Sequence, residues 1–422
     1  MNDAELLFRQ AMEFHRQGLA EQALEYLTRA AALMPGHAGI WNNRGNILRD
    51  LGRPQEALAS FQQALTLRPG SASALYNCAN VLLLDLHRPD SALPLYDQAL
   101  SLNPDFVEAW NNRGNALWGL RRLEEAMASF AKALALRPDF TDAMNGRAQV
   151  LFEMGLTEQG IAQFIQSAAL LPPDGEGPAF KRRHDREQAE YLEGLPVHTK
   201  AGGRVAGPAV TPGNAAGTGQ WKTKSPQIAV IDNFLTPDAL RALRRFCLEE
   251  KIWRSANPNG YLRAFPEHGF ALPLLGQIAD ELAANLPDIF LGYPLLYMWA
   301  FKYDSTLSGT NIHADEAVVN VNFWITPDEA NLDPESGGLV LWDVAAPMDW
   351  QFAKYNSDSA AIRSFLEEAG AKSVTVPYRC NRAVIFDSDL FHETDKIRFK
   401  EGYLNRRINV TMLFGQRDRA YP

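Results

Sequence analysis

Cysteine is scarce in this chain: three residues, Cys78, Cys247 and Cys380, are spread over 422 positions. They are far apart and form no C-x-x-C pair, which argues against a disulfide framework and against a structural zinc site. We therefore expect buried or neutral thiols in a reducing compartment.

Positive charge and long apolar runs are lacking as well. The chain has 41 lysines and arginines against 50 aspartates and glutamates, a net charge of −9. This balance argues against nucleic acid or an anionic membrane as a partner. No apolar run reaches membrane-spanning length, and the acidic residues 1–5 lack a signal-peptide pattern. We expect a cytoplasmic protein that binds neither membranes nor nucleic acid.

Several catalytic motifs are also absent. The sequence has no P-loop, no G-x-S-x-G and no H-E-x-x-H, which argues against nucleotide hydrolysis, an α/β-hydrolase and a zincin. What is present is enough apolar material, 46% of the residues, to build cores. At this length we expect two or three domains.

The first part of the chain is an internal repeat. Prolines recur 34, 35, 34 and 34 residues apart, at Pro35, Pro69, Pro104, Pro138 and Pro172. The string WNNRGN occurs twice, at 41–46 and 110–115. This period, with tryptophan, glycine, alanine and proline at fixed offsets, is typical of tetratricopeptide repeats. We predict five repeats over residues 3–172, forming an all-α solenoid, with the extra residue of the third repeat in the turn at 85–89.

Two shorter segments follow the repeats. A charged, amphipathic pattern predicts a helix within residues 173–193, which we expect to cap the last repeat. Residues 194–227 are rich in glycine, proline and threonine and poor in large apolar side chains. We predict a flexible linker there, or a loop ordered only against a neighbouring element.

Residues 228–422 form the second predicted domain. Short strand-like runs dominate, and strands are expected near 228–231, 295–303, 317–326, 339–343, 373–376, 383–387 and 407–414. In one of them, Val319, Val321, Phe323 and Ile325 alternate with polar neighbours. Helices are expected near 236–245, 272–286 and 358–369. Many short strands joined by turns indicate a barrel or a sandwich.

A metal-ligand pattern lies in this strand-rich part. His313 and Asp315 are two residues apart, so on an extended strand both side chains point to the same face. His392 follows far downstream. Two histidines and one carboxylate are the ligand set of non-haem Fe(II) oxygenases, which leaves open coordination positions. Taken singly, each of these residues would be read as an ordinary polar residue near a strand end.

Arg407 is the candidate for binding an anionic co-substrate. In the run 406–412, Arg407, Asn409 and Thr411 alternate with apolar residues. If the apolar set packs on the body of the domain, Arg407 faces a polar cavity, where its guanidinium can hold a carboxylate through two hydrogen bonds. Arg406 is the alternative, and we expect it to point outward near solvent.

Together these residues resemble a known family. The order His313-x-Asp315, Gly337-Gly338-Leu339, Phe386…His392 and Arg407 over roughly residues 228–416 resembles the Fe(II)/2-oxoglutarate-dependent dioxygenases, nearest the prolyl-hydroxylase-like branch. The resemblance implies a double-stranded β-helix (jelly-roll) with flanking helices. It also implies Fe(II), 2-oxoglutarate and O2, with ascorbate as an accessory reductant.

The resemblance also implies individual roles. His313, Asp315 and His392 would bind the iron, and Arg407 would bind the distal carboxylate of 2-oxoglutarate. Tyr303, Thr411 and Asn322 are the further candidates for the co-substrate pocket. A core tyrosine and an amide that bridges strands are the alternatives for Tyr303 and Asn322.

The repeats carry a row of amides. Side chains four residues apart share a helix face, and we predict a peptide-binding concave face formed by Asn42, Asn46, Asn80, Asn111, Asn115, Asn145 and Gln149. Such amides can hydrogen-bond an extended peptide backbone; a merely soluble face is the alternative.

The sequence therefore favours a dioxygenase that hydroxylates a peptide or protein held by the repeats. One alternative is a tetratricopeptide scaffold or adaptor whose oxygenase domain is inactive or peripheral. The other is an oxygenase for a small molecule, localised by the repeats. A narrow pocket mouth would favour a small molecule, and an open groove would favour a peptide.

Overall fold

The computed structural model describes residues 3–175, 177–195, 201–214, 218–219, 221–307 and 311–417. The chain divides into two compact units, Met1–Val150 and Leu151–Pro422. Each unit is described by itself below.

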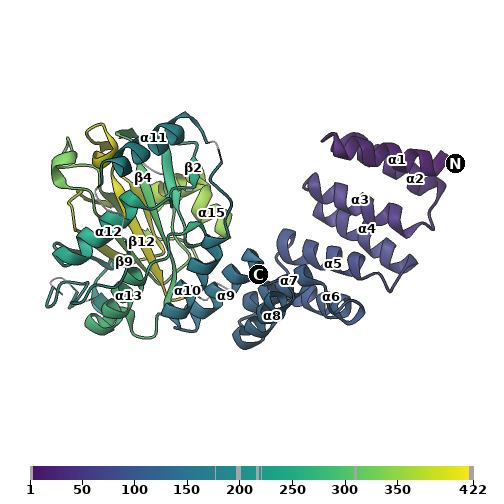
Figure 1. Ribbon diagram of the computed structural model, residues 1–422, viewed down its shortest axis with the longest axis horizontal. Helices are drawn as coiled ribbons and strands as arrows, with labels where there is room; N and C mark the ends of the chain where they lie inside the picture. The colour runs from purple at the N-terminus through teal and green to yellow at the C-terminus, as the bar shows by residue number, and fades with distance from the viewer. Residues whose placement is uncertain are drawn as a thin grey trace. The chain divides into compact units, whose positions relative to one another are not determined.

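The first unit is built from antiparallel helix pairs that stack in sequence order (Figure 1). The helices are α1 (Asp3–Arg16), α2 (Ala20–Leu33), α3 (Ala38–Asp50), α4 (Pro54–Leu67), α5 (Ala72–Asn80), α6 (Pro89–Leu102), α7 (Val107–Gly119), α8 (Leu123–Leu136) and α9 (Thr141–Glu153). The repeated glycines allow this close stacking. A Cβ on Gly45 would lie 2.6 Å from the ring of Phe61, and one on Gly114 would lie 2.7 Å from Phe130. Only a residue without a side chain fits there.

The extra residue of the third repeat lies one turn earlier than the sequence predicts. After α5 the chain forms a π-helical turn, η1 (Val81–Asp85). Such a turn absorbs one inserted residue within a helix. The turn at 85–89, where we expected the insertion, therefore keeps nearly the ordinary length.

The second unit contains the remaining helices and all of the strands. Its helices are α10 (Thr157–Ala169), α11 (Ala179–Glu193), α12 (Pro237–Glu249), α13 (Pro273–Asn285), α14 (Pro287–Phe290), α15 (Phe352–Ser357) and α16 (Ser359–Glu368). Its short 3-10 turns are η2 (Trp221–Thr223), η3 (Pro266–His268), η4 (Asp328–Ala330) and η5 (Tyr403–Asn405). Thr236 starts α12 as a cap, because its hydroxyl accepts from the Ala239 amide.

The strands form three antiparallel sheets. They are β1 (Ile228–Ile231), β2 (Ser255–Asn257), β3 (Tyr261–Ala264), β4 (Leu295–Tyr303), β5 (Thr306–Leu307), β6 (Val319–Trp324), β7 (Leu339–Ala345), β8 (Ser373–Val376), β9 (Ala383–Asp387), β10 (Leu390–Thr394), β11 (Ile397–Arg398) and β12 (Ile408–Phe414). The large sheet has the order β1-β9-β6-β12-β4-β3-β2, and the small ones are β10-β7-β8 and β11-β5.

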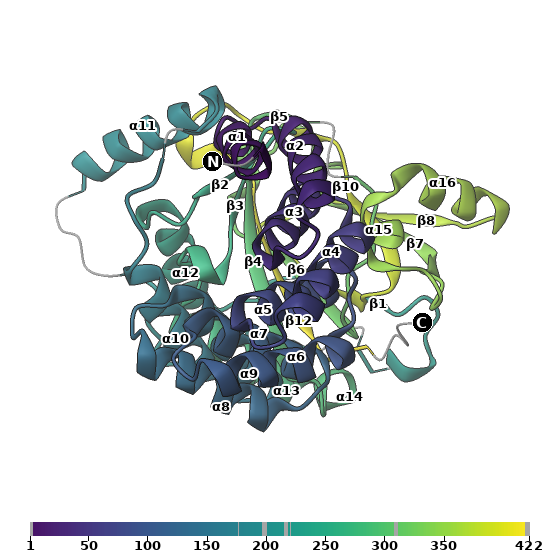
Figure 2. The ribbon, with the colours of Figure 1, turned by 90° about the vertical axis from the view of Figure 1, so that its right-hand side faces the viewer.

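The two larger sheets share one apolar core. Tyr303, Trp324 and Phe386 from the large sheet join Leu341 and Leu390 from the three-stranded sheet in one buried cluster. A second cluster packs α16 against β7, and Figure 2 shows α15 and α16 beside β7 and β8. The prediction of a strand-rich second domain is confirmed, and its sheets are antiparallel.

Helix α10, the second helix of the fifth repeat, belongs to the second unit. It packs on α13 and η3. A Cβ on Gly276 of α13 would lie 2.8 Å from Ile161 of α10, so the two helices are in close contact. Helix α10 is thus covered by α13 and η3 of the same unit.

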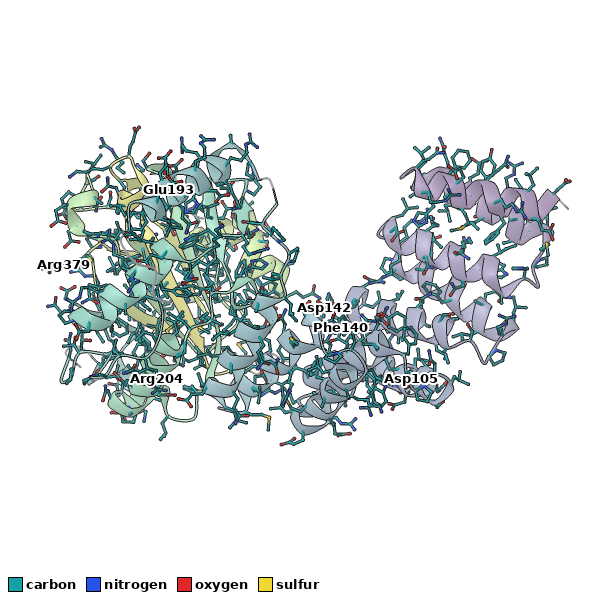
Figure 3. The ribbon with its side chains drawn as sticks, viewed as in Figure 1. Asp105, Phe140, Asp142, Glu193, Arg204 and Arg379 are labelled. Carbon is teal, nitrogen blue, oxygen red and sulfur yellow. The ribbon has the colours of Figure 1, made fainter. Side chains whose placement is uncertain are left out.

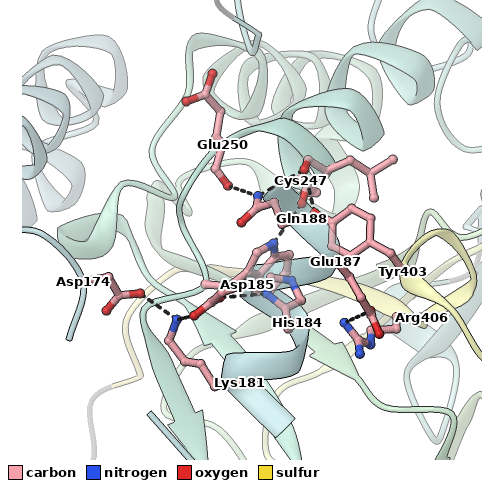
Figure 4. A network of polar contacts seen from close by, with 12 residues as sticks. Asp174, Lys181, His184, Asp185, Glu187, Gln188, Cys247, Glu250, Tyr403 and Arg406 are labelled. Carbon is pink, nitrogen blue, oxygen red and sulfur yellow. Dashed lines mark hydrogen bonds and ion pairs between the residues drawn. The ribbon is translucent and has the colours of Figure 1, made fainter. Parts of the chain in front are cut away.

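Helix α11 does not cap the repeats, contrary to our expectation. It lies on α12 and η5, and the Gln188 amide donates to the carbonyls of Leu248 and Glu250 at 3.1 Å each (Figure 4). His184 is buried against Trp253 and Tyr403. The helix is amphipathic because it covers the strand-rich domain.

The predicted linker is ordered over residues 201–214, as a strap against α13. The Glu281 carboxylate accepts from the amides of Ala209 and Val210, and the Gln277 side chain accepts from the Val205 amide. Arg204, labelled in Figure 3, pairs with Glu158 of α10. In these residues the chain is a loop packed against a neighbouring helix, the second of our two expectations for this segment. Residues 196–200, 215–217 and 220 lie outside the described residues.

No helix within the described part of the chain is both long and apolar enough to cross a membrane.

Candidate metal centre and its pockets

Main-chain hydrogen bonds bring the predicted ligands together. His313 and His392 face each other in an isolated antiparallel bridge. The His313 amide donates to the His392 carbonyl at 3.0 Å, and the His392 amide donates back at 2.8 Å. The Asp315 amide donates to the carbonyl of Ser388 at 3.1 Å, and Ser388 lies four residues before His392. Segments almost 80 residues apart in sequence are thus fixed by backbone contacts.

The three side chains converge on one point. His313 Nε2 lies 3.9 Å from Asp315 Oδ1, and His392 Nε2 lies 3.5 Å from Asp315 Oδ2. One ligand atom from each residue falls within 4.8 Å of the other two. Asn320 donates to Asp315 Oδ2 at 2.7 Å and so orients the carboxylate.

The hydrogen bonds of the imidazoles select the atoms that face this point. His313 Nδ1 lies 2.8 Å from the Asn311 carbonyl, and His392 Nδ1 lies 3.1 Å from the Leu390 carbonyl. A carbonyl only accepts, so each Nδ1 carries the proton and each Nε2 keeps its lone pair. Both lone pairs are therefore available to a metal ion.

Electrostatics favours the protonation states of a metal site. Burial, followed by the nearby His392, lowers the pKa of His313. Burial alone would raise the pKa of Asp315, but the hydrogen bond with His392 and the two imidazoles bring it below its ordinary value. A neutral imidazole and an ionised carboxylate are the forms that bind metal.

Arg407 is fully buried at the start of β12. Its Nε donates to the Gly337 carbonyl at 2.6 Å, and its guanidinium lies 4.9 Å from the ring centre of Tyr303 and 5.5 Å from that of Trp324. Its Nη1 has no hydrogen-bond partner, and no carboxylate pairs with it among the described residues. Burial lowers its pKa. An enclosed cation with a free donor is a site for an anion.

Arg406 points to the opposite side of the strand, as its parity predicts, but it is not near solvent. It is 5% exposed and lies under α11, where its Nη1 is 2.9 Å from Glu187 Oε2 (Figure 4). We expected an outward, solvated side chain because the sequence does not reveal that α11 covers this face.

The other predicted pocket residues lie on the same face of the large sheet. The Tyr303 hydroxyl is 3.4 Å from that of Thr394. The Thr411 hydroxyl accepts from Asn322 and from Asn409, at 3.1 Å each. The buried oxygens of Asn322 and Asn409 have no partner. Asn322 thus bridges β6 and β12 and still presents a free acceptor.

A cleft of about 530 Å³ opens beside His313 and Asp315. One wall is a row of aromatic rings from β4, namely Tyr297, Trp299 and Phe301. Tyr261 of β3 and Phe265 continue this wall. Four asparagines also line the cleft, Asn257, Asn259, Asn311 and Asn356. Among the described lining residues there is no lysine or arginine.

Sequence reasoning missed this aromatic wall and the enclosure of Arg407. The signal for the wall was present, because aromatic residues occupy every second position from 297 to 303. Only Tyr303 was singled out. Tyr378, whose ring centre is 5.9 Å from the Arg407 guanidinium, stands alone in a loop and gives no pattern. The carbonyls of Gly337 and Gly338, which hold Arg407, likewise have no sequence signature.

In the repeats, part of the amide row is turned inward. Asn80 and Asn111 are buried. Asn80 accepts from the Tyr96 hydroxyl at 2.6 Å and from Asn112 at 2.9 Å, so it bridges helices rather than presenting its oxygen to a peptide. Asn42 accepts from Asn77 of the next repeat. Asn46, Asn115, Asn145 and Gln149 are partly exposed.

Comparison with known proteins places the repeats in a family. Tetratricopeptide-repeat models match residues 36–105 and 81–139. Uncharacterized protein MJ0572 of Methanocaldococcus jannaschii is 34% identical over 74 residues, which are 18% of this chain and 86% of that protein.

Solved structures show similarity at lower levels. The chain is 26% identical to MamA residues 41-end from Desulfovibrio magneticus RS-1, with a TM-score of 0.39, covering 40% of this chain and 96% of that one. YrrB, described as a TPR protein with an unusual peptide-binding site, is 24% identical, with a TM-score of 0.36, covering 40% and 88%. The repeat models together match residues 36–139, so this part of the chain contains tetratricopeptide repeats.

Proposed function

We propose that this protein is an Fe(II)- and 2-oxoglutarate-dependent dioxygenase that hydroxylates a peptide or protein. One observation carries the proposal. One ligand atom from each of His313, Asp315 and His392 lies within 4.8 Å of the other two. This set matches the ligands of non-haem Fe(II) oxygenases.

The strand order supports the finer fold assignment, a double-stranded β-helix. Such a fold needs two facing antiparallel sheets of four strands each. The large sheet supplies β9-β6-β12-β4, and the other supplies β10-β7-β8 with the His313 segment bridged to β10 as its fourth member. The metal ligands then lie at one end of the fold, on the segment of His313 and on β10.

The residues present fit an iron ion. His313 and His392 each offer a neutral nitrogen, Asp315 offers a carboxylate, and Asn320 holds that carboxylate in place. When bound, the iron would supply the activation of O2 and the oxidation of a C–H bond. The protein orients its three ligands and surrounds them with buried side chains.

Arg407 fits the distal carboxylate of 2-oxoglutarate. Its free Nη1 supports this role, as does the lack of a carboxylate partner among the described residues. Two backbone carbonyls and the ring of Tyr303 hold the guanidinium in one orientation. A bound carboxylate would compensate the buried charge.

The cleft supports a polypeptide as the substrate. Its aromatic wall suits an apolar side chain, and its asparagines can hydrogen-bond peptide groups. Because no lysine or arginine was found among its lining residues, a phosphorylated or otherwise anionic substrate lacks a partner there. Asn259, Asn311 and Phe352 at the cleft are exposed, which favours a segment of a larger molecule over an enclosed small one.

The second candidate is a scaffold or adaptor. The match of the repeats to tetratricopeptide models favours it, since such arrays provide extended binding surfaces. In that case the metal site would be inactive, and the array alone would carry the function.

Succinate release from 2-oxoglutarate tests the enzyme. The protein is loaded with Fe(II) without oxygen, the reaction is started with oxygen, and wild type is compared with His313→Ala. We expect iron-dependent release that the variant loses. Absence of both iron binding and release in wild type would favour the scaffold. If wild type releases succinate, peptides that it retains from a random display library can be tested as substrates.

A further inference from the structure

The aromatic wall of the cleft is tied to a segment outside the sheet. The Tyr297 hydroxyl lies 2.8 and 3.0 Å from the two carboxylate oxygens of Glu267, which belongs to η3. Tyr297 also stacks on Phe265, with ring centres 6.4 Å apart and planes at 25°. Among the described residues, no lysine or arginine pairs with Glu267. The phenol is therefore the donor that satisfies this carboxylate.

The same segment is seated on the fifth repeat. Turn η3 packs against α10. Gly269, which ends the turn at φ +102°, faces α10 at van der Waals distance, since a Cβ there would lie 3.8 Å from the Cβ of Ala168. Residues 265–269 thus have one side in the cleft and the other on the repeat.

We propose that Glu267 and Tyr297 are positioning residues that couple the fifth repeat to the substrate cleft. The contact with α10 holds η3 in position. The hydrogen bonds between Glu267 and Tyr297 then hold the Tyr297 ring, and with it the aromatic wall, in position. The role in substrate affinity rests on the proposed function. The mechanical link does not, because it follows from contacts that are present whatever the reaction.

The link has a measurable strength. If the Tyr297 hydroxyl is removed, the Glu267 carboxylate loses its hydrogen-bond donor, and the position of η3 becomes less stable. Tyr297→Phe removes the donor alone and keeps the ring, and Glu267→Gln removes the charge. Tyr261→Phe is the matched control, because its hydroxyl also lies at the cleft but contacts Asn257 instead of η3.

Amide hydrogen exchange of the full chain tests the link without any substrate. The amides of His268, Gly269 and Phe270 are hydrogen-bonded within the turn and report on its opening. We expect Tyr297→Phe and Glu267→Gln each to speed their exchange by about tenfold, and Tyr261→Phe to leave it unchanged. Equal exchange in all variants would overturn the link.

Affinity for a peptide selected on the wild-type protein tests the coupling. We expect the KM for this peptide to rise about tenfold in Tyr297→Phe, while kcat and the KM for 2-oxoglutarate stay within about twofold. Ala168→Leu, which presses on Gly269 from the repeat, should weaken peptide binding in wild type but add little to Glu267→Gln. Additive effects would refute the coupling. If no peptide is retained by wild type, the substrate class is wrong, and the exchange result still decides the link.

Discussion

The two adjacent arginines at the start of β12 have opposite surroundings, and so opposite consequences when removed. Arg407→Ala takes away the cation proposed to bind the distal carboxylate of the co-substrate, so we expect the KM for 2-oxoglutarate to rise about 100-fold. Arg407→Lys should be nearly as damaging, because an ammonium cannot reproduce the planar fork. Steady-state succinate release measures both variants.

Arg406→Ala is the control for this prediction. It leaves Glu187 partly buried without its cation, and we expect a loss of about 2 to 3 kcal/mol in the free energy of unfolding with little change in the KM. If Arg406→Ala raised the KM more than Arg407→Ala, the assignment of the anchor would be reversed.

The backbone carbonyl of Gly338 accepts a hydrogen bond from Arg407 Nη2 at 3.4 Å. A Cβ at this position would lie 1.8 Å from the carbonyl oxygen of Val376 in β8. We expect Gly338→Ala to lower the free energy of unfolding by about 3 kcal/mol or more, because the β7–β8 pair must move apart. Gly203→Ala is the matched control, since nothing lies within 4 Å of its Cβ position. Urea unfolding of both variants measures the difference, and equal stability would contradict the close approach.

Helix α11 covers a buried layer of ionisable groups, and this makes its attachment sensitive to acid. Burial, and after it the charge of Lys302, lowers the pKa of His184 from 6.5 to about 3, although Asp185 beside it acts in the opposite direction. Between about pH 6.5 and pH 3, His184 therefore stays neutral in the folded protein, whereas in the unfolded chain it binds a proton. The stabilisation is complete above pH 6.5 and is lost progressively as the pH falls toward about 3.

A substitution isolates this contribution. At about pH 5 the wild type should have lost about 2 kcal/mol of stability from this group relative to about pH 7.5. His184→Phe keeps a ring against Trp253 and Tyr403 but cannot bind a proton. The variant retains Lys302, Arg406 and Asp185, although Asp185 loses its hydrogen bond with His184 Nδ1. Urea unfolding at both pH values should show that the free energy of unfolding falls less between about pH 7.5 and about pH 5 in the variant than in wild type. An equal fall in both proteins would contradict the role of His184.

Elements with a strong local pattern could be predicted from the sequence. Strands β4, β8 and β9 have the expected bounds, because each is a run rich in β-branched, aromatic or other apolar residues that ends at turn residues. Strands β2, β3 and β10 could not be predicted, since each mixes polar and apolar side chains in no periodic order. Local pattern also shows which face is buried, but not what covers it. That is why α11 and Arg406 were assigned to the wrong surroundings.

Only those features of the candidate site that depend on local spacing could be predicted from the sequence. The spacing of His313 and Asp315 reveals a shared face, and the parity of Arg407 reveals its side of the strand. The convergence with His392 depends on a backbone bridge between distant segments. The enclosure of Arg407 depends on rings and carbonyls from four separate segments, β4, β6, the loop of Tyr378 and the turn of Gly337 and Gly338. Such long-range contacts leave no local signal.

For the molecule as a whole, the main lesson is that the end of the repeat array is built into the strand-rich unit. Helix α10 belongs to that unit, and its Ile161 and Phe164 are buried. A boundary at residue 172, where the repeats end in sequence, would therefore remove part of the second unit's core. A boundary before α9 would keep the fifth repeat intact.

Two truncations test this organisation. The fragment 141–422 keeps α9 and α10, whereas 173–422 lacks both and exposes the faces of α13 and η3 that α10 covers. Burial of Ile161 and Phe164 alone contributes about 5 kcal/mol, an amount comparable with the whole stability of a domain. We expect 141–422 to unfold cooperatively and to bind iron, and 173–422 to aggregate or to unfold at a much lower urea concentration. If both fragments were equally stable, the fifth repeat would be an appendage, and the proposed route from the repeat through Glu267 to the cleft would lose its starting point.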